Sequence, residues 1–267
     1  MRRRLSVFPL SSATLATVLC GVYCSAGRDR AATEEVSRQE TGVTSKPSVQ
    51  AGTLYVGRSP QGVGWVLDLD VARGSGRLFA PSGTIPLCRV TSDSTGRASF
   101  NSPELSNGTE YRFAGRVSSA GFDGVLQQVA ARSGRVRQSF VTSLKPIRLR
   151  NQPRRPTGDV SGIYSNVSHH AQTGDILGNE LLLIDGEDEV VVLTIIYAGG
   201  PDWPRLAERV ELRGDSLWLW TRYPLRGDTM DIGLVKGDTI QFGRDYKMAK
   251  RASLGAVFAQ PSPYRCP

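Results

Sequence analysis

The chain has few histidines, few cysteines and few aromatic residues. His169 and His170 are its only two histidines, and no Cys-x-x-Cys or His-x-His motif accompanies them. Neighbouring residues on a strand point to opposite faces, so adjacent histidines rarely bind one metal ion together. We therefore predict neither a metal site nor a cofactor. We expect the two histidines to lie in a solvated loop.

The chain also lacks a strong excess of charge. Its formal net charge is +8, and no dense lysine and arginine cluster contains interleaved aromatic residues. Because nucleic-acid binders concentrate basic residues on one face, this composition argues against nucleic acid as a partner. Between residues 52 and 142, no stretch keeps the 3.6-residue apolar period of an amphipathic helix, which favours strands instead.

The N-terminus has the pattern of a secretion signal. Arg2, Arg3 and Arg4 form a basic start, residues 5–23 carry no charge, and Cys24-Ser25-Ala26 supplies small residues for cleavage. We expect the mature protein to be periplasmic or secreted. The alternative is a lipid anchor through Cys24 or Cys20, although Tyr23 and Leu19, which precede these cysteines, fit a lipoprotein signal poorly. We expect the membrane to be a partner only if the protein carries this lipid anchor.

Only Cys88 and Cys266 lie beyond the predicted signal. One cysteine pair in an oxidising compartment is naturally interpreted as one disulfide. It would join the first half of the chain to its extreme C-terminus. Two free, unrelated thiols are the alternative, because the sequence does not show that the two Cα atoms approach within about 7 Å.

Short strands separated by turn residues fill the rest of the chain. Tyr111, Phe113, Gly115 and Val117 alternate with more polar residues, as in a half-buried strand. Residues 190–196 form a nearly continuous apolar run, which predicts a strand buried on both faces, and residues 217–220 suggest the same.

We therefore predict an all-β protein with two small antiparallel barrels or sandwiches. A stretch rich in proline and arginine separates them. The expected parts are a signal peptide (1–26), a flexible arm (27–50), a first β domain (51–144), a linker (145–158) and a second β domain (159–267).

Three motifs mark the second half of the chain: Gly162-Ile-Tyr-Ser-Asn, Thr173-Gly-Asp-Ile-Leu-Gly-Asn-Glu-Leu and Gly237-Asp-Thr-Ile-Gln-Phe. With these motifs, residues 158–245 resemble small extracytoplasmic bacterial β-barrel domains of lipocalin-like type. The resemblance implies a closed or half-open antiparallel barrel whose lumen can hold one small ligand. It transfers no catalytic residue to any position of this chain.

One motif is typical of a hydrolase. Gly214-Asp215-Ser216-Leu217 spells the nucleophile block of GDSL-type hydrolases, in which Ser216 would need a histidine held by an acid. No histidine follows His170, and the block lies between two strands that read as antiparallel. We interpret the block as a hairpin turn, predict that the protein is not an enzyme, and assign no catalytic residue.

Large aromatic residues gather in the second half of the chain. Trp203, Trp218, Trp220 and Tyr223 are the candidate ligand-binding residues, with Trp218 and Trp220 on one strand face as a possible pocket wall. We expect an envelope protein that binds a small ligand, a glycan or an envelope protein. The alternative is a structural or protein-interaction module that binds no small ligand.

Overall fold

The computed structural model describes residues 53–80, 83–118, 120–151, 158–223 and 227–267. The predicted signal peptide, flexible arm and lipid-anchor cysteines, together with residues 152–157 of the linker, lie outside these ranges. All described residues belong to one compact unit, Val49–Pro267. In the described part of the chain, no helix is both long enough and apolar enough to span a membrane.

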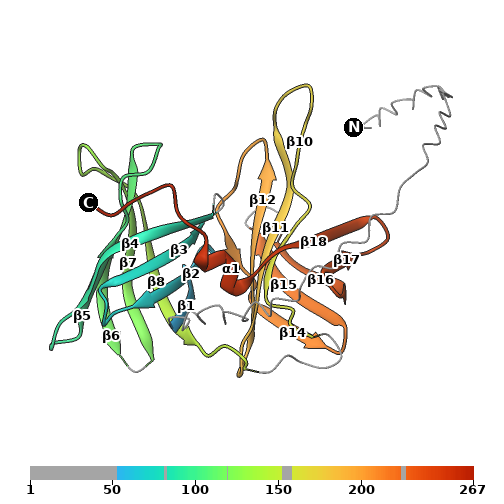
Figure 1. The fold of residues 1–267 in the computed structure, drawn as a ribbon, viewed down its shortest axis with the longest axis horizontal. Helices are drawn as coiled ribbons and strands as arrows, with labels where there is room; N and C mark the ends of the chain where they lie inside the picture. The colour runs from blue at the N-terminus through green and yellow to red at the C-terminus, as the bar shows by residue number, and fades with distance from the viewer. Residues whose placement is uncertain (1–52, 81–82, 119, 152–157, 224–226) are drawn as a thin grey trace, which may run out of the picture. The chain divides into compact units, whose positions relative to one another are not determined.

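The first half is a closed antiparallel barrel, drawn from blue to green in Figure 1. Each strand pairs with the next, and β1 closes the barrel by pairing with β8, where Leu54 lies opposite Ile147. The last strand of the barrel ends at Ile147. The strands are β1 (Thr53–Arg58), β2 (Gly64–Asp70), β3 (Ser75–Ala80), β4 (Gly83–Ser92), β5 (Arg97–Asn101), β6 (Thr109–Ser118), β7 (Gly121–Ala130) and β8 (Val136–Ile147).

The second half is one antiparallel sheet that curls into a half-barrel. Its order is β13-β12-β11-β9-β18-β17-β16-β15-β14, with β10 paired to β11. Both halves confirm the predicted all-β fold. The elements are β9 (Gly162–Ser165), β10 (Ser168–His169), β11 (Ile176–Asp185), β12 (Val190–Ala198), β13 (Arg205–Leu206), β14 (Arg209–Arg213), β15 (Ser216–Tyr223), β16 (Gly227–Lys236), β17 (Thr239–Phe242), β18 (Tyr246–Ser253) and α1 (Leu254–Ala259).

Aromatic and aliphatic side chains fill the interior of the closed barrel. Phe113 stacks on Phe100 with 4.8 Å between ring centroids, and both rings are buried. Gly115 and Gly124 face each other across β6 and β7, and a Cβ at either position would come within 3.0 Å of the Phe113 ring. The glycines therefore leave room for this ring, as in other cases where an aromatic side chain covers glycines in a sheet.

The strands β11 and β12 have apolar cores on both of their faces, as the run at residues 190–196 predicts. On one face, Leu182 and Leu193 pack against Leu54 and Val66 of the barrel wall. On the other face, residues that include Leu181 and Val192 form the core of the half-barrel. Burial on both faces explains why these strands show no apolar and polar alternation.

A disulfide joins Cys88 to Cys266, as predicted, with 5.6 Å between the Cα atoms. Its cysteines are 178 residues apart, and the chain-entropy model gives such a loop about 5 kcal/mol as an upper limit. The tail after α1 also receives a 2.8 Å hydrogen bond from the Arg77 guanidinium to the Gln260 carbonyl oxygen. This disulfide suggests that the protein folds in an oxidising compartment.

Candidate functional site

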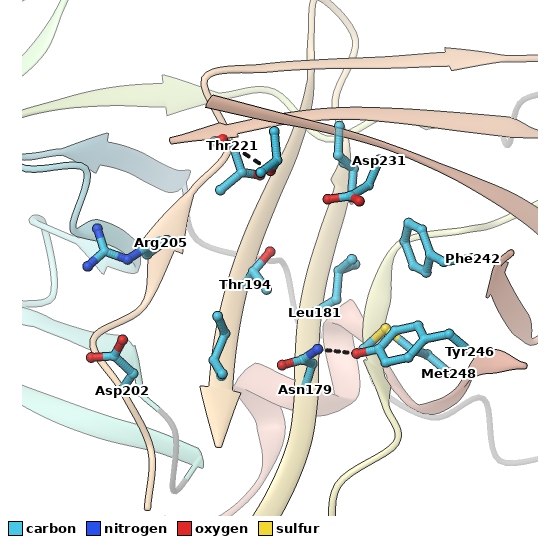
Figure 2. A pocket seen from close by; sticks show the side chains of 13 residues that line it. Asn179, Leu181, Thr194, Asp202, Arg205, Thr221, Asp231, Phe242, Tyr246 and Met248 are labelled. Atoms are coloured by element: carbon cyan, nitrogen blue, oxygen red, sulfur yellow. Dashed lines mark hydrogen bonds between the residues drawn. The ribbon is translucent and has the colours of Figure 1, made fainter. Parts of the chain in front are cut away.

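The candidate site is a cavity of about 640 Å³ on the concave face of the second sheet. Figure 2 shows its lining side chains converging from both arms of the curled sheet. The 13 lining residues combine uncharged polar, charged and apolar groups. They are Asn179, Leu181, Thr194, Ile196, Asp202, Arg205, Leu219, Thr221, Thr229, Asp231, Phe242, Tyr246 and Met248.

Strand alternation explains how these residues come together. Leu181 lies opposite Thr194 in the β11–β12 pair, and directly paired residues of antiparallel strands share a face. On the far arm, Leu219 lies opposite Asp231 and Thr221 lies opposite Thr229. The curl of the sheet turns these two surfaces toward the same space.

Apolar side chains and two aromatic rings form the floor and one wall of the cavity. Leu181, Leu219 and Met248 are buried, whereas Phe242 and Tyr246 are only half-buried. The two rings stand edge to face, with 6.0 Å between their centroids. They therefore present an apolar surface on which a ligand can pack.

Hydrogen bonds position two of the uncharged polar groups. The Asn179 amide donates to the Tyr246 hydroxyl, as the dashed line in Figure 2 shows. The Thr229 hydroxyl donates to the backbone carbonyl of Thr221 at 3.3 Å. The Asn179 amide and the Thr229 hydroxyl are thus held in place at the cavity, one on each arm of the sheet.

Three charged side chains line the same cavity. The Arg205 guanidinium donates a 3.1 Å hydrogen bond to the carbonyl oxygen of Gln61 in the barrel. The Asp202 carboxylate accepts a 2.8 Å hydrogen bond from the backbone N–H of Trp203. In the described part of the chain, no ion pair joins Asp202, Arg205 or Asp231 to another residue, so each charge can interact with a ligand.

Trp218 and Trp220 share one strand face, but this face lies opposite the one that lines the cavity. Their rings are stacked, with 6.2 Å between centroids and 20° between planes. Leu219 and Thr221, which alternate with them, point into the cavity. The guanidinium groups of Arg209 and Arg213 lie over the two indoles at 4.8 and 5.0 Å. Residues 217–220 are therefore not buried on both faces as the apolar run predicts.

The other two predicted aromatic residues are separated from this pair. Trp203 lies between β12 and β13 and packs against Trp65 and Phe140 of the barrel, with centroid distances of 6.1 and 5.2 Å. Tyr223 ends β15 opposite Gly227, and its side chain lies outside the described part of the structure. The structure thus brings together Trp218 and Trp220 only, and a ligand-binding role for the four residues stays a prediction.

The sequence contains a signal for two of the cavity residues, Thr194 and Thr221. Thr194 is the single polar residue in the apolar run 190–196, and Thr221 continues the inward series of Leu217 and Leu219. A polar residue in phase with buried apolar residues marks an interior that is not fully packed with apolar groups. Asp202 and Tyr246 lie outside such runs and give no comparable signal.

The residues considered for catalysis and metal binding lie at turns and hairpins. Ser216 begins β15 after a turn in which Gly214 has φ of 57°, the backbone conformation that glycine readily adopts. His169 and His170 are exposed at the β10–β11 hairpin, where Thr173 hydrogen-bonds to the His170 ring. Among the described residues, no group of three or more His, Cys, Asp or Glu side chains could hold a metal ion.

Comparison with known proteins finds no matching family model, no matching curated protein and no matching solved structure.

Proposed function

We propose that this chain is a non-enzymatic binding protein that holds a small polyhydroxylated ligand, such as a glycan fragment, in the half-barrel cavity. One observation carries the proposal. The concave face of the curled sheet carries the polar side chains of Thr194 and Thr221 beside half-buried rings, and the exposed carboxylates of Asp202 and Asp231 also line the cavity. Inward-facing strand positions normally form a close-packed apolar core instead.

The mixed lining suits the chemistry of a sugar. Sugar hydroxyls act as donors and acceptors, which the Asn179 amide, the Arg205 guanidinium and the Asp231 carboxylate can match. The C–H face of a sugar ring is apolar and packs against aromatic surfaces such as Phe242 and Tyr246. A purely apolar ligand would leave the polar groups without partners, at a cost in free energy.

The side chains that line the cavity favour ligand binding over catalysis. Nucleophilic catalysis needs a hydroxyl or thiol within hydrogen-bond distance of a base. Among the described lining residues, no hydroxyl is hydrogen-bonded to an imidazole, a thiol or a carboxylate. We propose that the protein acts in the periplasm or after secretion, or else on the membrane through a lipid anchor at Cys24 or Cys20.

The test is saturation-transfer NMR and titration calorimetry with cellobiose, maltose and N,N′-diacetylchitobiose on the mature protein. We expect at least one disaccharide to bind, and Asp231→Asn or Phe242→Ala to weaken its affinity about tenfold, the effect of one lost contact. Asp215→Asn, in the β14–β15 turn, is the matched control and should leave affinity unchanged. Binding of none of the three sugars, or equal losses in the control, would reject the proposal.

A second function is favoured by a different observation. Met230, Ile232 and Leu234 are 52, 44 and 37% exposed on the outer face of β16. They lie opposite Trp220, Trp218 and Ser216 in the strand pairing, which makes one apolar outer face. Exposed apolar patches of this kind often mark protein contacts. If the protein is an interaction module, Ile232→Ser should abolish its native complexes in sedimentation while sugar binding is unaffected.

A further inference from the structure

We propose that the ligand of the half-barrel cavity is a cationic amino sugar, recognised through its protonated amino group. This inference rests on the proposed sugar-binding function and names the class of sugar. Three features of the cavity carry it: the charges of its lining, the hydrogen-bonding groups that remain free, and one buried hydroxyl that the cavity reaches.

The charged residues of the cavity are mainly acidic. Among the described lining residues, Asp202 and Asp231 are acidic and Arg205 alone is basic. Arg205 donates one guanidinium N–H to the carbonyl oxygen of Gln61 in the barrel, 3.1 Å away. Asp231 is exposed, has no ion-pair or hydrogen-bond partner among the described residues, and faces the cavity in Figure 2. A positive group on the ligand can therefore reach this carboxylate, whereas a negative group would be repelled.

The hydrogen-bonding groups that remain free in the cavity are mainly acceptors. The Asn179 amide nitrogen donates to the Tyr246 hydroxyl, and the amide oxygen has no partner among the described residues. The Thr229 hydroxyl gives its single proton to the backbone carbonyl of Thr221, so it can only accept from a ligand. With the Asp231 carboxylate, these oxygens form a set of acceptors. An ammonium group has three donors and no acceptor, and so it matches this set.

The side chain of Thr221 points to a polar ligand. Thr221 is only 4% exposed, and its hydroxyl has no hydrogen-bond partner among the described residues. This hydroxyl is accessible from the cavity, unlike the fully enclosed hydroxyl of Thr142 in the barrel. Because a buried polar group without a partner costs free energy, we expect a hydroxyl or amino group of the ligand to bind here.

The two half-buried rings favour an amino sugar over a linear amine. Phe242 and Tyr246 stand edge to face in the same lining as the acceptors. Aromatic faces attract cations, and they also pack against apolar surfaces such as the C–H face of a sugar ring. A linear diamine carries the charge but offers no ring-shaped apolar surface.

The test compares three β-1,4-linked disaccharides by titration calorimetry on the mature protein at about pH 6, below the pKa of such amines. Diglucosamine carries ammonium groups at its 2-positions, cellobiose carries hydroxyls, and N,N′-diacetylchitobiose carries neutral acetamides. We expect diglucosamine to bind about fivefold more tightly than either neutral sugar, the value of one exposed ion pair. Putrescine, a linear diamine, should bind more weakly than diglucosamine.

Two variants and a matched control locate the preference. Asp231→Asn should remove it, because diglucosamine loses about fivefold more affinity than cellobiose does. Thr221→Val should weaken both sugars alike, since a hydroxyl carries no charge. Asp215→Asn removes a carboxylate from the exposed β14–β15 turn and should keep the preference. On the unaltered protein, added salt should weaken diglucosamine binding and leave cellobiose binding unchanged.

The outcomes separate this inference from the function on which it rests. If diglucosamine and the neutral sugars all fail to bind, the sugar-binding function is rejected together with the inference. If a neutral sugar binds as tightly as diglucosamine, or if Asp231→Asn keeps the preference, the cavity binds sugars without recognising an amino group, and only the inference is overturned. Putrescine binding as tightly as diglucosamine would also overturn it, because the sugar ring would then contribute nothing.

Discussion

The closed barrel and the half-barrel differ in what their inward-facing positions hold. In the barrel, rings such as Phe113, Phe122 and Phe140 converge with aliphatic residues into one buried cluster. In the half-barrel, the apolar cluster continues on one side into the cavity that Thr194 and Thr221 line. Two antiparallel sheets of similar strand length thus hold apolar and aromatic side chains in one interior and a cavity lined by polar and apolar side chains in the other.

This difference suggests that the barrel has a supporting role and the half-barrel a binding role. The outer wall of the barrel supplies Leu54, Val56 and Val66 to the core that covers the back of β11 and β12. The concave face of the same two strands stays available for the cavity. We infer that the barrel acts as a rigid support for the half-barrel, since sites are held more precisely on well-packed elements.

The largest expected effect on stability comes from removing a buried ring from the barrel core. Phe113 is 2% exposed and stacks on Phe100, so Phe113→Ala should lower the free energy of unfolding by about 4 kcal/mol. Phe242→Ala removes a half-buried ring at the cavity and should lower it by about 1 kcal/mol. Urea unfolding monitored by circular dichroism measures both. Equal losses would mean that the two interiors are packed alike.

Removing the disulfide should have the next largest effect. Replacing both Cys88 and Cys266 by serine is expected to lower the free energy of unfolding by about 3 kcal/mol, because the unfolded chain regains its long loop. The core shared by the barrel and the half-barrel remains, so we expect calorimetry to show one transition. Two separate transitions would show that the disulfide, and not this core, couples the halves.

Two buried threonines, Thr142 in the barrel and Thr221 in the half-barrel, test the same contrast between the two interiors with a smaller expected effect. Thr142 is 3% exposed on β8, and its hydroxyl has no partner among the described residues. Thr142→Val should therefore stabilise the protein by about 1 kcal/mol in urea unfolding. Thr221→Val, at a cavity-lining position, should instead weaken disaccharide binding. Destabilisation by Thr142→Val would show that its hydroxyl is in fact satisfied.

Much of the fold follows from the sequence, because alternation and turn residues act locally. The period-2 pattern at residues 111–117 appears in β6, where Phe113 points inward and Arg112 and Ala114 are exposed. The run at residues 190–196 correctly predicts burial on both faces of β12. The disulfide could be proposed because only two cysteines follow the signal pattern.

The site could not be predicted in the same way, because curvature decides which face of a strand is concave. The sequence shows that Trp218 and Trp220 share a face, yet the same alternation holds for Leu219 and Thr221. Only the curl of the sheet makes the second pair face the cavity. The approach of Trp203 to Trp65 likewise depends on packing between segments far apart in sequence, for which no local pattern exists.

The smallest expected effect is on how the free energy of unfolding depends on pH. One carboxyl in each sheet contributes to this dependence. Burial raises the pKa of Glu180 above its usual 4.5, opposed by a hydrogen bond from the Tyr197 hydroxyl and by the charge of Arg251. The folded protein therefore binds this proton more tightly than the unfolded chain does. Its stabilising contribution is complete below pH 4.5 and is lost as pH rises through the folded pKa.

In the barrel, burial likewise raises the pKa of Asp68 above its usual 3.8, with Arg77 lowering it and Asp70 adding to the rise. The free energy of unfolding should fall as pH rises above 4.5 for Glu180 and above 3.8 for Asp68. Glu180→Gln and Asp68→Asn should each make this fall smaller, whereas Glu104→Gln, at an exposed position, should not. Urea unfolding from pH 4 to pH 8 measures the slopes. An unchanged slope in either variant would show that the folded protein does not raise the pKa of that carboxyl.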